Sequence, residues 1–107
     1  MSADALKRLR RTVRGWKLNR QTHVALAALA TQYNPIIQGW WNYYAAFYQT
    51  AMFQVSQHID RALERWARRK YKALSGRKRG GVLWLRKMKD VEPQLFHHWR
   101  EVGNRVG

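Results

Sequence analysis

The amino-acid sequence predicts an all-α fold, a small bundle of about four to six helices. Apolar residues recur three or four positions apart through most of the chain, which is the spacing of one helix face. Apolar types make up 46% of the residues, too many for a disordered chain. The length of 107 residues suits one domain with a modest core, so we treat residues 1–107 as a single domain.

The first predicted helix covers roughly residues 3–14, with Ser2 as its N-cap and Gly15 at its end. Its apolar positions form one stripe: Leu6, Leu9, Val13 and Trp16. Basic residues occupy the rest of its circumference: Lys7, Arg8, Arg10, Arg11 and Arg14. A second helix, capped by Asn19 or Thr22, is rich in Ala and Leu and runs to about Gln32.

A third helix is predicted to begin at Pro35, with Asn34 as its cap, because residues before proline avoid helical geometry. Large apolar residues fill one arc of its wheel: Ile36, Ile37, Trp40, Trp41, Tyr43, Tyr44, Phe47 and Tyr48. We expect most of these rings to form a core hub. Stacking of one or two of them on nucleic-acid bases is the alternative.

A long fourth helix is predicted over roughly residues 51–74, ending at Ser75-Gly76. Its expected buried face consists of Met52, Val55, Ile59, Leu63 and Trp66. Its opposite side carries a row of cations, which are Arg61, Arg65, Arg68 and Lys72, with Arg69 beside them. One cation per turn of about 5.4 Å can follow a phosphate backbone. Asp60 and Glu64 are expected to pair with these arginines.

The remaining segments are shorter. Arg77, Lys78 and Arg79 precede two glycines, so residues 77–81 are predicted to form a basic loop. Residues 82–90 are predicted to be helical, with a strand over 82–85 as the alternative. Pro93 opens a short last helix whose apolar residues fold back onto the core, and residues 101–107 are expected to fray.

Net charge is the strongest functional signal. The chain has 21 Lys and Arg against 6 Asp and Glu, a net charge of +15. Such a charge favours a polyanion, so nucleic acid is the expected partner and an anionic membrane surface the less favoured one. Few acids, no Cys and scattered histidines make catalysis by this chain unexpected, and no metal, other cofactor or small-molecule substrate is expected. The polar interruptions in residues 21–57 indicate core rather than a membrane span.

Several motifs together resemble one family. The stretch LNRQTHVALAALATQYNPIIQGWWNYYAAFY is followed by HIDRALERWARRKYKAL and, near the end, by EPQLFHHWR. These are similar to the group II intron maturase-specific domain, also called thumb or domain X, which follows the reverse transcriptase in intron-encoded proteins. The resemblance rests on Asn34-Pro35, on residues 39–44 (GWWNYY) and on residues 66–69 (WARR), and it covers about residues 6–100.

The resemblance implies an RNA-binding domain of a bacterial mobile element that helps intron RNA fold for splicing, in the cytoplasm or with the nucleoid. The expected RNA contacts are Lys7, Arg8, Arg11, Arg14, Arg61, Arg65, Arg68, Arg69, Lys72, Arg77, Lys78 and Arg79. No polymerase motif occurs, so polymerase activity is not carried over, and a fingers-and-palm part in cis or in trans is the expected protein partner. The alternative is a vestigial or structural module that binds nucleic acid non-specifically.

Overall fold

The computed structural model describes residues 3–76 and 79–106. This part of the chain contains six α-helices, one 3-10 helix and no strand, which confirms the predicted all-α bundle. In order, the elements are α1 (Ala3–Gly15), η1 (Leu18–Arg20), α2 (Leu26–Tyr44), α3 (Gln49–Lys70), α4 (Lys72–Ser75), α5 (Gly80–Val91) and α6 (His97–Val106).

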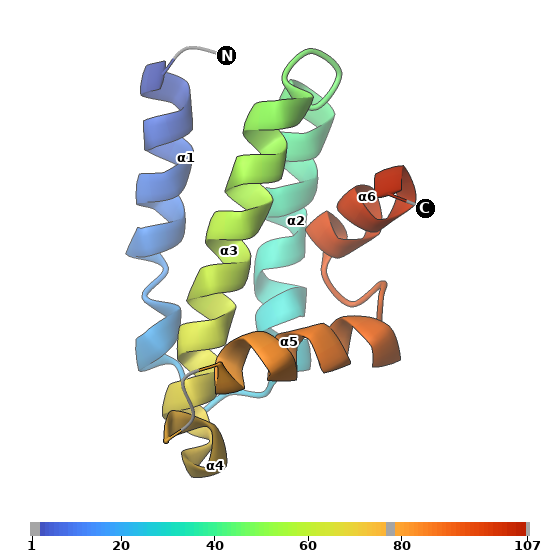
Figure 1. Cartoon of the computed structure of the whole chain (residues 1–107). Coiled ribbons are helices and arrows are strands. Elements are labelled where there is room, and N and C mark those ends of the chain that lie inside the picture. The colour runs from blue at the N-terminus through green and yellow to red at the C-terminus, as the bar shows by residue number, and fades with distance from the viewer. Residues whose placement is uncertain (1–2, 77–78, 107) are drawn as a thin grey trace.

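Helix α3 is the centre of the bundle. Helices α1, α2 and α3 lie alongside one another with alternating chain direction, α5 crosses the foot of α3, and α6 lies beside α2 (Figure 1). Helix α3 contacts all five other helices as well as η1. Its position in the bundle therefore decides which of its side chains are buried.

The predicted buried face of α3 is confirmed. All five expected residues are almost fully buried: Met52, Val55, Ile59, Leu63 and Trp66. The same helix also holds the segment between η1 and α2, because the indole N–H of Trp66 donates to the Gln21 carbonyl over 2.9 Å. Lys70 Nζ donates to the Val24 carbonyl over 2.6 Å. These bonds fix the path by which the chain passes from α1 to α2.

The predicted break at Asn34-Pro35 is wrong, because α2 continues through Pro35. Proline in a helix interior removes one backbone hydrogen bond and costs about 3 kcal/mol. Here the apolar face of the helix is continuous on both sides of Pro35, and its buried residues are Leu26, Leu29, Ala30, Tyr33, Ile37 and Trp41. Burial of this single face stabilises the continuous helix against the local cost.

Asn34 caps a different helix from the one predicted. Its side-chain Oδ1 accepts the backbone N–H of His97 over 2.8 Å, and its Nδ2 donates to the Leu95 carbonyl over 2.9 Å. His97 is the first residue of α6. Asn34 therefore satisfies a free donor at the start of α6 and joins that helix to α2.

The predicted long helix over 51–74 is interrupted at Tyr71. Helix α3 ends at Lys70, Tyr71 has extended backbone angles (φ −109°, ψ 110°), and the short α4 follows. The Tyr71 ring lies edge-on to Trp66, with centroids 6.2 Å apart, and 5.8 Å from Trp84. These ring contacts accompany the change of direction, so Lys72 does not continue the helical row of α3.

Residues 80–91 form a helix, so the alternative of a strand over 82–85 is wrong. The glycines predicted as loop residues begin this helix and are buried. A Cβ atom on Gly81 would lie 2.8 Å from the Glu64 carbonyl oxygen and 3.0 Å from Arg68 Cγ. Glycine is therefore needed where α5 crosses α3. At the other end of the chain, α6 extends to Val106, across most of the segment expected to fray.

The aromatic arc predicted over residues 36–48, which spans the second half of α2 and the turn after it, is only partly a core hub. Ile37 and Trp41 are buried, and Trp40 and Tyr44 pack partly buried against the core. The remaining four are exposed, which corrects the prediction for them: Ile36, Tyr43, Phe47 and Tyr48. The arc is wider than the surface its neighbours cover. Trp16 is stacked between the rings of Tyr33 and Trp40, with centroid distances of 4.2 and 5.6 Å.

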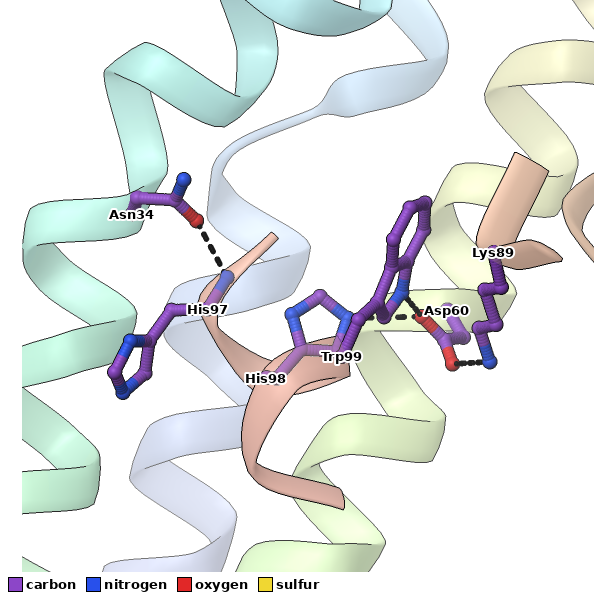
Figure 2. A network of polar contacts seen from close by, with 6 residues as sticks. All are labelled: Asn34, Asp60, Lys89, His97, His98 and Trp99. Carbon is purple, nitrogen blue, oxygen red and sulfur yellow. Dashed lines mark hydrogen bonds and ion pairs between the residues drawn. The ribbon is translucent and has the colours of Figure 1, made fainter. Parts of the chain in front are cut away.

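A buried carboxylate joins α3, α5 and α6 (Figure 2). Asp60 Oδ1 accepts the indole N–H of Trp99 and a hydrogen bond from His98 Nε2, both over 2.8 Å. Asp60 Oδ2 accepts Lys89 Nζ over 2.6 Å. The expectation that Asp60 pairs with arginines of its own helix is therefore wrong, because its side chain points to the opposite flank of α3.

The environment of Asp60 keeps it ionised. Burial raises the pKa of this carboxyl group, but the hydrogen bond and charge of His98, together with Lys89, outweigh burial and hold the pKa below its ordinary value. The charge of Asp60 acts in turn on Glu64, whose pKa is raised by burial and by this neighbouring carboxylate.

Asp60→Asn should lower the free energy of unfolding by about 3–5 kcal/mol, because it removes one partner of a buried charge network. The asparagine amide would also place a donor opposite Lys89. Lys89→Ala is the matched comparison and should cost at most about 1 kcal/mol, because the Lys89 side chain is 42% exposed. Urea unfolding measures both values, and equal costs would contradict the central role of Asp60.

Acid should destabilise the protein through Asp60. A carboxyl group whose pKa is lowered by folding stabilises fully above its ordinary pKa of 3.8, and this contribution is lost as the pH falls through the lower pKa of the folded state. Glu64, with its raised pKa, contributes with the opposite sign. Thermal unfolding from neutral to acidic pH should therefore show a steeper loss in the wild type than in Asp60→Asn. Parallel curves would contradict this assignment.

Candidate nucleic-acid interface

Helices α1 and α3 enclose a cationic groove of about 500 Å³. Arg10 and Arg14 line it from α1, and Arg61 lines it from α3. The remaining lining residues are Gln54, Gln57 and His58. No carboxylate is among these lining residues, so the groove has a positive potential suited to an anion.

A smaller hollow of about 180 Å³ continues the groove toward η1. It shares Arg14 and His58 with the first groove and adds Lys17 and Arg65 to the cationic lining. The rest of its lining is uncharged: Val13, Leu18, Asn19 and Ala62. The two hollows adjoin at Arg14 and His58 and are here together called the α1–α3 groove.

Two contacts order the cations of the α1–α3 groove. An Arg10 Nη donates to the Gln54 side-chain oxygen over 3.3 Å and connects the two helices. Arg65 Nε donates to the Arg61 carbonyl on the same helix over 3.4 Å. In the described residues, both bonds leave the guanidinium groups without a carboxylate partner. They therefore keep their capacity to bind phosphate oxygens bidentately.

The pKa of His58 depends on the charges that line the groove. Burial is the largest cause that lowers the pKa of this imidazole, and the charges of Arg10, Arg14 and Arg65 lower it further, against a raising hydrogen bond to the Arg10 backbone. His58 is half-buried between the two rows of cations. A neutral imidazole is thus favoured while the groove contains no anion.

The predicted RNA-contacting residues of the first helix divide between two sides. Lys7, Arg8, Arg11 and Arg14 are all exposed. Arg14 lines the α1–α3 groove. Arg8 lies about 160° around the helix from the groove residue Arg10, so it belongs to the opposite flank of α1. The basic face of α1 therefore supplies the groove from one flank only.

The predicted cationic row on α3 also divides. Arg61 and Arg65 line the α1–α3 groove. Arg68 is exposed, but its aliphatic stem lies against Gly81 at the start of α5. Arg69 and Lys72 are exposed outside the groove, and Lys72 belongs to α4. Arg79 is exposed immediately before α5, whereas Arg77 and Lys78 lie outside the described residues.

Three basic residues of the groove are absent from the predicted set: Arg10, Lys17 and His58. Arg10 and Arg14 are four residues apart on α1, and His58, Arg61 and Arg65 recur at three- and four-residue spacing on α3. This spacing could have indicated two rows that face each other. The sequence pattern does not specify how α1 is rotated about its own axis, and this rotation decides which of its flanks lies beside α3.

Two further features are absent from the part of the chain that the structure describes. No helix is both long enough and apolar enough to span a membrane. No group of three or more His, Cys, Asp or Glu side chains is placed to hold a metal ion.

An RNA strand in the α1–α3 groove should raise the pKa of His58, because phosphates offset the charges of Arg10, Arg14 and Arg65. An NMR pH titration of the imidazole signals, with and without RNA, measures the shift. His97 is the matched control, since its pKa is lowered by burial on α6 rather than by the groove. A shift at His97 alone would place the anion elsewhere.

The comparisons with known proteins identify the chain by its sequence. Residues 6–84 match the family model described as "Group II intron, maturase-specific domain". This match runs from within α1 through α4 to the first residues of α5 and includes every lining residue of the α1–α3 groove. No curated protein and no solved structure matches the chain. Because the family model covers well over half of the residues, the chain belongs to the group II intron maturase-specific domain family.

Proposed function

We propose that this domain binds group II intron RNA through the α1–α3 groove and assists folding of the intron for splicing. One observation carries the proposal: Arg10, Arg14, Arg61 and Arg65 come from two helices and flank one groove that no carboxylate lines. The net charge of +15 supports it, and so does membership of a maturase-specific family. Structured RNA is recognised mainly by shape and backbone, which suits a surface of arginines.

The proposal assigns RNA binding and no catalytic step to this chain. A reverse transcriptase fingers-and-palm part, joined in cis or supplied in trans, is the proposed protein partner, and the complex is a ribonucleoprotein of the bacterial cytoplasm or nucleoid. Further RNA contacts outside the groove are proposed for seven basic residues: Lys7, Arg8, Arg11, Arg68, Arg69, Lys72 and Arg79. They are exposed on the same helices or near them and extend the positive surface beyond the groove.

The groove makes a quantitative prediction about salt. If its four arginines and Lys17 neutralise about five phosphates, the slope of log K against log salt should be about −3.5 to −4.5. The double variant Arg10→Gln/Arg61→Gln should flatten that slope by about 1.4 to 1.8, because two phosphate contacts are lost. Fluorescence anisotropy with an intron RNA, between about 50 and 200 mM salt, gives both slopes.

The matched control is Arg86→Gln/Lys87→Gln, which removes the same charge from exposed positions on α5 outside the groove. It should change the slope much less. Equal effects of the two double variants would mean that net charge, rather than the groove, binds RNA. Equal affinity for intron RNA and for a random RNA of the same length would favour a non-specific module.

Splicing separates assistance from binding. Intron RNA is incubated with the domain alone and with a separately supplied reverse transcriptase part. A faster splicing rate in either mixture, reduced by Arg10→Gln/Arg61→Gln, supports the proposal. No acceleration in either mixture, despite tight and specific binding, would contradict a role in splicing.

A further inference from the structure

A second cavity lies on the opposite flank of α3 from Arg65, between α3, α5 and α6. Its volume is about 320 Å³, at the lower end of the range for ligand pockets. Apolar walls come from Phe53, Pro93 and Trp99, and the polar lining includes Asp60 and Lys89. The cavity thus combines aromatic surface with a single ionised acceptor.

Asp60 has one acceptor position left. Its Oδ1 accepts two hydrogen bonds, from His98 and Trp99, whereas its Oδ2 accepts one, from Lys89. Each carboxylate oxygen offers about two lone-pair sites. Because Asp60 lines the cavity, a planar group with an N–H donor can bond the second site of Oδ2 there.

Phe53 supplies a stacking surface at this cavity. It is 45% exposed although it lies on the helix that forms the centre of the bundle. An aromatic ring beside a cationic path is the arrangement that single-stranded nucleic acids use, with bases stacked on rings and phosphates on cations. The nucleobases all carry both a stacking face and at least one polar edge.

Gln57 connects the cavity to the α1–α3 groove, because it lines both. The two sites therefore flank the same turn of α3. A strand whose phosphates lie in the groove would run beside Gln57, which also lines the cavity. The charge of the groove makes nucleic acid the occupant that the surroundings favour.

We propose that this cavity receives one unpaired nucleobase of the RNA bound in the α1–α3 groove, stacked on Phe53 and hydrogen-bonded to Asp60. The inference rests on the proposed function and adds a base-recognition site to a surface otherwise built for phosphates. RNA with an unpaired nucleotide is then preferred over a continuous duplex.

The test uses the full chain and two RNA hairpins that differ only at one bulged nucleotide, which is adenosine in one and abasic in the other. Wild type should bind the adenosine hairpin about tenfold or more tightly than the abasic one, as loss of base stacking predicts. Phe53→Ala should abolish that difference without weakening binding to the abasic hairpin. Phe53→Tyr should restore it, because the ring is retained.

Phe47→Ala is the matched control, since it removes the same side chain from a position that is 82% exposed and does not line the cavity. It should leave the preference intact. Fluorescence of 2-aminopurine at the bulge should fall on binding to wild type and not to Phe53→Ala.

Three outcomes would overturn the inference. Equal binding of both hairpins by wild type, with the predicted salt slope, would refute the base site alone. Failure to bind either hairpin would refute the proposed function as well. Self-association of wild type in sedimentation velocity, abolished by Phe53→Ala, would make the cavity an interface between two copies.

Discussion

Helix α3 packs one side of its circumference into the apolar core and presents a row of cations on another side. One face carries the apolar side chains around which the bundle packs, and another carries arginines whose mutual repulsion favours separation. The buried face fixes α3 in the bundle and so holds those cations close together. Burial of the apolar core offsets the electrostatic repulsion between them. Every other helix contacts α3. The packing of Leu63, Trp66 and their neighbours therefore determines how far apart the arginines lie, and the arginines' own interactions do not.

The same helix directs the carboxylate of Asp60 away from the arginines of the groove. Asp60 is turned toward α5 and α6, where Lys89, His98 and Trp99 bond it. Arg61 and Arg65 are turned toward α1. A carboxylate exposed in the groove would neutralise part of its field, so burying this acid strengthens the groove as well as the fold. The stability of the fold and the affinity of the groove for anions thus both depend on how α3 is oriented about its own axis.

Helical periodicity predicted the buried apolar face of α3, together with Leu9 and Val13 of α1, because a continuous apolar stripe has only one way to leave water. It did not predict the burial of Ala5 on α1. The local rule for proline failed at Pro35, where packing on both sides outweighed it. The expected pairing of Asp60 within its own helix failed because its partners lie about 30 to 40 residues away in sequence. The groove could be predicted only in part. Arg14, Arg61 and Arg65 follow from their helices, but the pairing of α1 with one flank of α3 is a tertiary fact that no local pattern contains.

The bare backbone at Gly81 sets the distance between two helices. Its Cα has no room for a side chain above the Glu64 carbonyl. Lys89 lies eight residues further along α5, about 12 Å away along the helix axis. A methyl group added at residue 81 would push the start of α5 away from α3. Because α5 is one continuous helix, this displacement would also weaken the bond between Lys89 and Asp60 at its other end without altering any charge.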